Sequence, residues 1–211
     1  MRDLSTTDPV LFAELAATYD LFAGLVQNLD LKSGVGPGLG LGGKLLYAGE
    51  LTSESAHLIR AANIAGAASL TATADLAMQR ATIREAIADF LVTDLDEALR
   101  ILKNEIRKRQ TVAVCISAAL EVIEEEMLER GVLPDLRAPI ASQRLPEDQI
   151  FLAVTEPPEG FEARAAALIP ESDEIIRRWL RLSPRYLGPK ARRVRSLACT
   201  KEIAAVLTAD H

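Results

Sequence analysis

The sequence predicts an α/β domain of three layers, in which a mainly parallel sheet lies between two layers of helices. Short apolar segments alternate with helical segments from residue 44 to residue 136, and the loops between them are short. This alternation favours parallel strands joined by right-handed helical crossovers. Aromatic residues make up only 4% of the 211 residues, so Leu, Ile, Val and Ala must form most of the core.

A helix is expected before this domain, within residues 1–32. Asp8 suits the N-cap and Pro9 the first helical position. Apolar residues then recur at alternating steps of three and four, as on one face of a helix: Phe12, Leu15, Tyr19, Phe22, Val26 and Leu29. This seam is either a packing face within the chain or a contact between two copies.

The glycine-rich segment 33–43, SGVGPGLGLGG, precedes the first expected strand. A loop that cradles a phosphate follows a strand and opens a helix, so this segment is in the wrong place for that role. We expect it to be a flexible linker.

Four strand–helix units are expected within residues 44–136. The strands are predicted at 45–49, 69–73, 89–92 and 111–117, and the helices at 52–67, 75–86, 94–109 and 119–131. Asp94 and Glu97 suit a capping box at the start of the third helix, and Gly131 suits the end of the fourth.

The C-terminal extension, residues 137–211, is expected to complete the same domain. A polar loop at 137–148 leads to strands at 149–154 and 194–200 and to helices at 160–169, 173–182 and 202–209.

Several classes of protein are excluded by composition. Cys115 and Cys199 lie in apolar, strand-like segments and are expected to be buried free thiols, and no Cys/His spacing fits a metal site. No uncharged apolar run reaches the length of about 18 residues that a transmembrane helix needs. The first ten residues lack the apolar core of a signal peptide, so we expect a cytoplasmic protein.

The charge is unevenly distributed along the chain. The net charge is −6, yet residues 177–201 carry nine basic residues and no acidic one. The acidic remainder argues against general nucleic-acid binding. The basic segment could dock on the acidic body, within one chain or across a dimer, or bind a small anion. With Trp179 and Tyr186 as stacking platforms, it could also bind nucleic acid.

Three stretches between Gly43 and Asp135 carry a resemblance to a known family. They are GGKLLYAGEL with the following IAGAASL (42–51 and 64–70), TDLDEAL (93–99) and ERGVLPDL (129–136). They resemble the central NAD-binding domain of urocanase, which implies a Rossmann-like fold for this part of the chain. In that family a tightly held NAD acts as an electrophile in the addition of water to urocanate. In that family a surrounding domain supplies most of the chemistry, and we expect no counterpart of it in these 211 residues.

The resemblance also implies a run of glycines after the first strand, in the form GLGGMGG, where the backbone approaches the pyrophosphate of NAD. The aligned residues here are ELTSESA (50–56), with no glycine beyond Gly49. Side chains block that approach. Glu50 and Glu54 would repel a phosphate by about 4 kcal/mol per contact at ~4 Å and an effective dielectric near 20. We therefore expect no NAD bound in the family manner.

Ligands of such sheets bind at the carboxyl ends of the strands. The candidate cofactor- or ligand-binding residues there are Gly49, Thr52, Ser53 and Ser117, and the candidate catalytic residues are Glu50 and Asp75.

Each candidate has a structural alternative. Glu50 lies beside a helix N-terminus, whose dipole stabilises a carboxylate, and could be a general base, a ribose ligand or an exposed loop residue. Thr52, Ser53 and Asp94 suit N-caps. His57 and Asn63 are expected to be surface or packing residues.

We expect a non-catalytic, urocanase-like homodimer that binds a small polar or anionic ligand, or a protein partner, in the strand-end crevice. The alternative is a lyase or hydratase that acts on a small polar substrate through Glu50 and Asp75, with NAD in a modified mode. A third possibility is an assembly subunit whose basic segment docks a partner.

Overall fold

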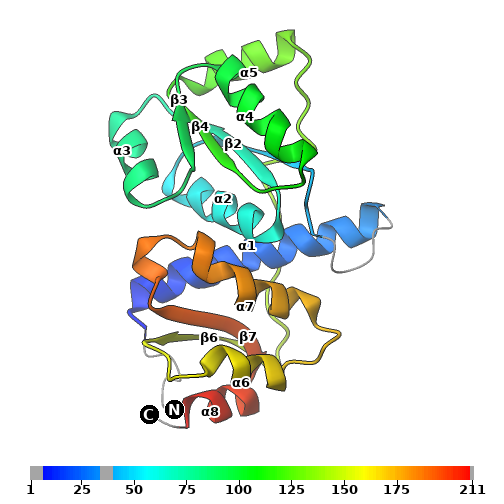
Figure 1. Ribbon diagram of the computed structural model, residues 1–211, viewed down its shortest axis with the longest axis vertical. Helices are drawn as coiled ribbons and strands as arrows, with labels where there is room; N and C mark the ends of the chain where they lie inside the picture. The colour runs from blue at the N-terminus through cyan, green and yellow to red at the C-terminus, as the bar shows by residue number, and fades with distance from the viewer. Residues whose placement is uncertain (1–6, 34–39, 210–211) are drawn as a thin grey trace.

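The computed structural model describes residues 7–33 and 40–209 (Figure 1). Most of the expected glycine-rich linker, residues 34–39, and the terminal His211 lie outside the described residues.

Five parallel strands form the main sheet. They are β1 (Leu45–Glu50), β2 (Ala68–Ala72), β3 (Phe90–Val92), β4 (Ala113–Ile116) and β5 (Leu136–Arg137). Their order across the sheet is β3-β4-β2-β1-β5, and every neighbouring pair is parallel. The pattern along the chain predicted four of these strands within a few residues, whereas only the family resemblance of residues 129–136 pointed to a strand near β5.

Helices cover both faces of this sheet, which confirms the three-layer α/β architecture (Figure 1). Helices α2 (Ser53–Ala65) and α3 (Leu76–Arg84) lie on one face, and α4 (Leu95–Arg107) and α5 (Leu120–Glu129) on the other. Side chains of α2 share one core with Leu46, Ala48 and Cys115 of the strands. Side chains of α4 and α5 share a second core with the strand residues that point the other way, such as Leu70 and Ile116. The alternation of side chains along a strand produces this division.

Helix α1 (Pro9–Ser33) lies across α2 and separates the main sheet from the C-terminal part of the chain (Figure 1). Four residues of the predicted seam are buried, since Leu15, Tyr19, Phe22 and Val26 are each at most 8% exposed, and Phe12 is half-buried. The seam is therefore a packing face within the chain. The side chain of Leu29 is not among those described.

Between Pro9 and Gln27, α1 is long and apolar enough to meet the length and hydropathy criteria of a membrane span. A core helix meets the same criteria, and α1 packs against α2, α7 and β6 of its own chain. The composition of α1 is thus accounted for by the core it helps to form.

The extension forms a sheet of its own instead of adding strands to the parallel one. Strands β6 (Gln149–Thr155) and β7 (Val194–Thr200) pair only with each other, and they are antiparallel. The remaining elements are α6 (Phe161–Leu168), α7 (Glu174–Tyr186), the 3₁₀ turn η1 (Pro189–Ala191) and α8 (Lys201–Thr208). One hydrophobic core continues from α2 through α1 and α7 to β6, β7 and α8. We propose on this ground that residues 44–136 and 137–211 are parts of one domain.

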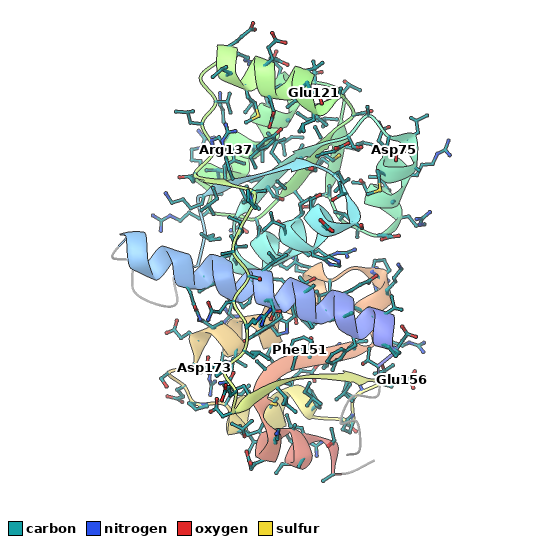
Figure 2. All side chains as sticks on the ribbon, turned by 180° about the vertical axis from the view of Figure 1, so that it is seen from behind. Asp75, Glu121, Arg137, Phe151, Glu156 and Asp173 are labelled. Atoms are coloured by element: carbon teal, nitrogen blue, oxygen red, sulfur yellow. The ribbon has the colours of Figure 1, made fainter. Side chains whose placement is uncertain are left out.

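Aromatic side chains are scarce, and several meet at one place between the two sheets. Phe12, Tyr19, Phe22, Phe151 and Trp179 form a cluster in which the Trp179 ring lies 5.0 Å from Tyr19 and 5.4 Å from Phe22. Figure 2 shows Phe151 between α1 and the C-terminal sheet. The fully buried Trp179 donates its indole N–H to the carbonyl of Ser196 on β7, at 2.9 Å.

The basic segment makes many of its contacts within the chain. Arg177 donates to the carbonyls of Ala166, Ile169 and Pro170 at the end of α6. Arg178 donates from Nε to the carbonyl of Ile64 near the end of α2, at 2.8 Å. Ion pairs join Arg193 to Glu156 and Arg195 to Glu162. These cations satisfy helix carbonyls and nearby carboxylates, as helix C-termini favour.

Candidate functional site

The carboxyl ends of four strands lie side by side at one edge of the main sheet. Glu50 pairs with Ala72, Ala72 with Ile116, and Ile116 with Val92. The residues that follow this row, including the predicted site residues, therefore belong to the same edge.

The helical connections diverge between the ends of β2 and β4, which is where the strand-end crevice is expected. Helix α3 follows β2 on one face of the sheet, whereas α5 follows β4 on the other face, and β2 and β4 are neighbours. Where the connections of adjacent strands diverge in this way, an open sheet binds its ligands. Asp75 follows β2 and Ser117 follows β4, so these two predicted residues belong to the two strand ends that flank this point. Gly49, Glu50, Thr52 and Ser53 lie beside it, at the end of β1.

The turn after β1 is closed by its own hydrogen bonds. The Ser55 amide donates to Thr52 Oγ1 at 3.1 Å, and the Thr52 amide donates to Ser55 Oγ at 2.8 Å. The Ser55 hydroxyl also donates to the carbonyl of Glu50 at 2.7 Å. This reciprocal capping box satisfies backbone donors at the start of α2. Thr52 thus has the capping role that was left open, while Glu50, Thr52 and Ser53 remain exposed.

Gly49 gives this turn its shape. It has a φ of 74°, in the left-handed region that side chains rarely adopt, and the pairing of β1 with β2 shifts register between Tyr47 and Gly49. A Cβ atom at Gly49 would meet nothing within 4 Å, so its backbone conformation and not crowding requires glycine. The Thr71 hydroxyl fixes the bulge by donating to the Gly49 carbonyl at 2.8 Å.

Asp75 and Asp94 are N-caps of the next helices. Asp75 Oδ1 accepts from the Ala77 amide at 2.7 Å, and Asp94 Oδ1 accepts from the Glu97 amide at 2.8 Å. Both carboxylates are exposed. Asp75 is therefore already engaged by backbone, although its exposed position leaves it open to a ligand.

Comparison with known families agrees with this architecture. A family model described as the urocanase Rossmann-like domain matches residues 35–147. The chain belongs to this family. The match confirms the resemblance carried by residues 43–135, and it covers the whole parallel sheet. The comparison with curated proteins found no match.

In the urocanase family the matching domain binds NAD, so the fit of these residues to NAD can be tested. The expected place of its pyrophosphate is the turn after β1. In this urocanase Rossmann-like domain the Thr52–Ser55 capping box engages the amides that a phosphate would need, and Glu50 and Glu54 add negative charge. The residues at this turn do not fit a pyrophosphate held by a glycine-rich backbone.

The start of α5 differs from the starts of the other helices around this urocanase-family sheet. Thr52, Asp75 and Asp94 cap α2, α3 and α4 through their side chains, but Ala119 gives α5 no side-chain cap. An uncapped helix N-terminus presents backbone N–H groups without partners. These groups follow directly after the half-buried Ser117, at the crevice. The sequence already contained this signal, since SAAL (117–120) has no capping residue at 119.

Other side chains singled out from the sequence lie elsewhere. Asn63 is near the end of α2 at the opposite edge of the sheet and is buried, with its Oδ1 3.5 Å from Ser69 Oγ. Cys115 and Cys199 are buried free thiols, as expected, and burial raises the pKa of each to about 11. Within residues 7–33 and 40–209, no three His, Cys, Asp or Glu side chains come together as metal ligands.

Two cavities away from the crevice were not anticipated. One, of about 870 Å³, lies beside the amino ends of β3 and β4, between α4 and the end of α7. The other, of about 350 Å³, lies between α1, α2 and α3 and is lined by His57, Arg60 and the predicted residue Ser53. Each cavity forms where helices from distant parts of the sequence pack together, so no local sequence pattern predicts it.

Proposed function

We propose that this urocanase-family domain is a non-catalytic binding protein that holds a small polar ligand in the crevice between the ends of β2 and β4. The observation that carries this proposal is the uncapped start of α5, placed with Ser117 at the point where the helical connections diverge. Backbone N–H groups and a hydroxyl would bind the ligand's acceptors.

The charges around the crevice select the kind of ligand. Asp75 and Glu121 are exposed carboxylates that follow β2 and β4, and Figure 2 shows both on the sheet part of the molecule, away from the C-terminal sheet. They oppose an anion, and Glu121 already interacts favourably with the dipole of α5. A neutral ligand with hydrogen-bond acceptors suits this arrangement better than a phosphate.

The sharpest test introduces a cap where the chain lacks one. In Ala119→Asp, the new carboxylate should occupy the same amides as the ligand, so binding should be lost while stability rises by about 0.5–2 kcal/mol. Binding is measured from the amide resonances of residues 117–122 during titration with ribose, uracil and nicotinamide. The matched control, Ala205→Asp on the exposed face of α8, should leave those titrations unchanged.

Two outcomes would overturn this proposal. One is that none of the three probes shifts these resonances in the unaltered protein. The other is that Ala119→Asp binds them as well as the unaltered protein does.

The non-catalytic part of the proposal has its own test. With urocanate and added NAD, the absorbance of urocanate should stay constant, and heat-denatured purified protein should release no NAD. Consumption of urocanate, or NAD in the supernatant, would instead support the lyase alternative with NAD in a modified mode.

We further propose that the protein is a cytoplasmic homodimer. Apolar side chains are exposed on α3 and on the neighbouring edge strand β3: Leu76 is 64% exposed, Ile83 58%, Phe90 46% and Leu91 37%. An exposed edge strand with apolar side chains is a surface that proteins usually cover. A second copy would cover it here.

A further inference from the structure

The cavity between α1, α2 and α3 combines polar side chains with an apolar floor. Its volume of about 350 Å³ lies at the lower end of the range of small-molecule sites, about 300–1,000 Å³. The titratable side chains that line it are Glu14, His57, Arg60, Arg84, Glu85 and Lys190. Leu15 and Ile87 are among its buried apolar residues.

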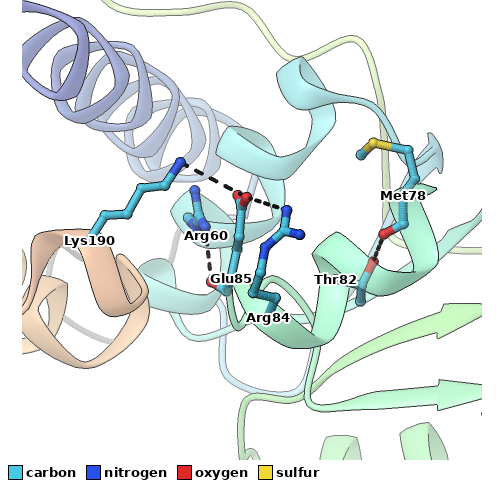
Figure 3. A network of polar contacts seen from close by, with 6 residues as sticks. All are labelled: Arg60, Met78, Thr82, Arg84, Glu85 and Lys190. Atoms are coloured by element: carbon cyan, nitrogen blue, oxygen red, sulfur yellow. Dashed lines mark hydrogen bonds and ion pairs between the residues drawn. The ribbon is translucent and has the colours of Figure 1, made fainter.

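Arg60 lines this cavity, and one of its side-chain donors has no partner. Its Nη2 donates to the carbonyl of Glu85 at 3.1 Å, as Figure 3 shows. Its Nε is buried and has no hydrogen-bond partner among the described residues. A buried guanidinium N–H without an acceptor is costly, and in proteins such groups are nearly always paired. Arg60 therefore keeps its positive charge beside the cavity with part of its donor capacity unused.

His57 offers the complementary group, a free acceptor. The Thr18 hydroxyl has one hydrogen, which it donates to the carbonyl of Glu14 at 2.8 Å. Its contact with His57 Nδ1, at 3.2 Å, must then have the imidazole as donor. Burial, together with the charge of Arg60, lowers the pKa of His57, so the ring is neutral near pH 7. The proton on Nδ1 leaves the lone pair of Nε2 available to accept a hydrogen bond.

Lys190 supplies a mobile positive charge at the rim. Its Nζ is 3.9 Å from Glu85 Oε1, which also contacts Arg84 at 3.2 Å (Figure 3). Lys190 is 64% exposed, so it can turn toward a ligand without leaving a buried position. With His57 neutral, the cations that line the cavity are Arg60, Arg84 and Lys190. They outnumber the two carboxylates, Glu14 and Glu85, so the cavity favours an anion.

We infer that this cavity binds a small hydroxycarboxylate. The ligand's carboxylate would accept from the Arg60 guanidinium and from Lys190 Nζ, and its hydroxyl would donate to His57 Nε2. The site is separate from the crevice between β2 and β4, where carboxylates oppose an anion. Its failure would leave the proposed function untouched.

Three probes of similar size separate the contributions of charge and hydroxyl in calorimetric titrations of the full chain. L-Lactate carries both groups, propionate lacks the hydroxyl, and lactamide lacks the charge. We expect lactate to bind roughly 5–10-fold more tightly than propionate, because one hydrogen bond is lost, and lactamide to bind most weakly.

Paired substitutions test each contact. His57→Asn keeps a donor toward Thr18 but removes the Nε2 acceptor, so it should bind propionate normally and lose the preference for lactate. His57→Gln retains an acceptor near the Nε2 position and should keep part of that preference. Lys190→Gln should weaken lactate and propionate equally, whereas Lys103→Gln, on the exposed face of α4, should change neither. Thermal melting confirms that each variant is folded.

The inference would be overturned by absence of saturable lactate binding, by equal affinity for lactate and propionate, or by lactamide binding as tightly as lactate. Tighter binding of inorganic phosphate than of lactate would also overturn it.

Discussion

At the scale of single residues, burial governs the chemistry of the few polar groups in the core. Tyr19, Tyr47, Cys115 and Cys199 are all nearly inaccessible to water. Burial raises the pKa of both phenols and both thiols because it disfavours the charged forms. These groups therefore stabilise the fold only while they are protonated.

This leads to an alkaline loss of stability. In the unfolded chain the thiols lose their protons near pH 9, whereas in the folded protein they do so at about 11. Between these values the unfolded state binds fewer protons, so the free energy of unfolding should fall as the pH rises. Urea midpoints measured across this interval check the slope, and the Cys115→Ala, Cys199→Ala double variant should have a shallower one. A flat profile would contradict the burial of these groups.

Trp179 should be the most sensitive single position of the core. It is fully buried, contacts three other rings and donates to the Ser196 carbonyl. Trp179→Phe leaves that acceptor without its partner and part of the space empty, which should cost about 1–3 kcal/mol in urea unfolding. Leu128→Ala, at a site 79% exposed on α5, is the control and should change stability far less.

At the scale of elements, most strands and helices could be predicted because their patterns are local. The seam of α1, the capping residues Thr52 and Asp94, and the apolar strands are all visible along the chain. The pattern along the chain did not predict strand β5, because its two residues have no pattern of their own. They become a strand only through pairing of Leu46 with Leu136 and of Tyr47 with Arg137. The candidate site could be predicted only in part. The edge of the sheet where it lies follows from the ends of the predicted strands, whereas the cavity lined by His57 forms only when α1 packs against α2 and α3.

Asp135 holds this short strand in place. Its carboxylate accepts from the Leu45 amide and from Lys44 Nζ, each at 2.9 Å, at the start of β1. Burial alone would raise the pKa of Asp135, but these hydrogen bonds and the charge of Lys44 hold it below its ordinary value. The stabilisation is present at neutral pH and is lost as the pH falls through that lowered pKa.

Asp135→Asn should therefore lower stability at pH 7 by about 1 kcal/mol, since both partners of the ion pair are partly exposed and much of the effect comes from the backbone contact. The difference from the unaltered protein should shrink in acid. Urea unfolding at pH 7 and at an acidic pH below the lowered pKa of Asp135 measures this difference in stability, with the exposed Asp148→Asn as control. A difference that stays constant with pH would show that the charge of Asp135 contributes nothing.

At the scale of the whole molecule, the sequence did not predict which distant segments pack or pair together. Alternating strands and helices predicted a parallel sheet, but the order β3-β4-β2-β1-β5 is set by packing between distant segments. The separate pairing of β6 with β7 is another such result, since both strands have the composition of the main sheet. The family match supports the fold of residues 35–147 and leaves the C-terminal sheet as an addition to it.

The proposed dimer is tested at this scale. Light scattering after size exclusion should give twice the mass of one chain, and Ile83→Lys should shift the protein to a monomer by placing a charge on the exposed surface of α3 and β3. Val206→Lys, at an equally exposed site on α8, should remain dimeric. A monomeric unaltered protein would exclude the dimer.

The central position of α1 has a consequence for synthesis. The ribosome makes this helix before every strand it contacts, and the parallel sheet can pair as soon as residues 45–137 have emerged. The aromatic face of α1, however, is covered by Phe151 and Trp179, which are synthesised much later. During translation, a paired parallel sheet would thus lie beside a helix whose apolar face is still exposed, until the last third of the chain is made. Chaperones would matter most in this interval, because exposed apolar surface promotes aggregation.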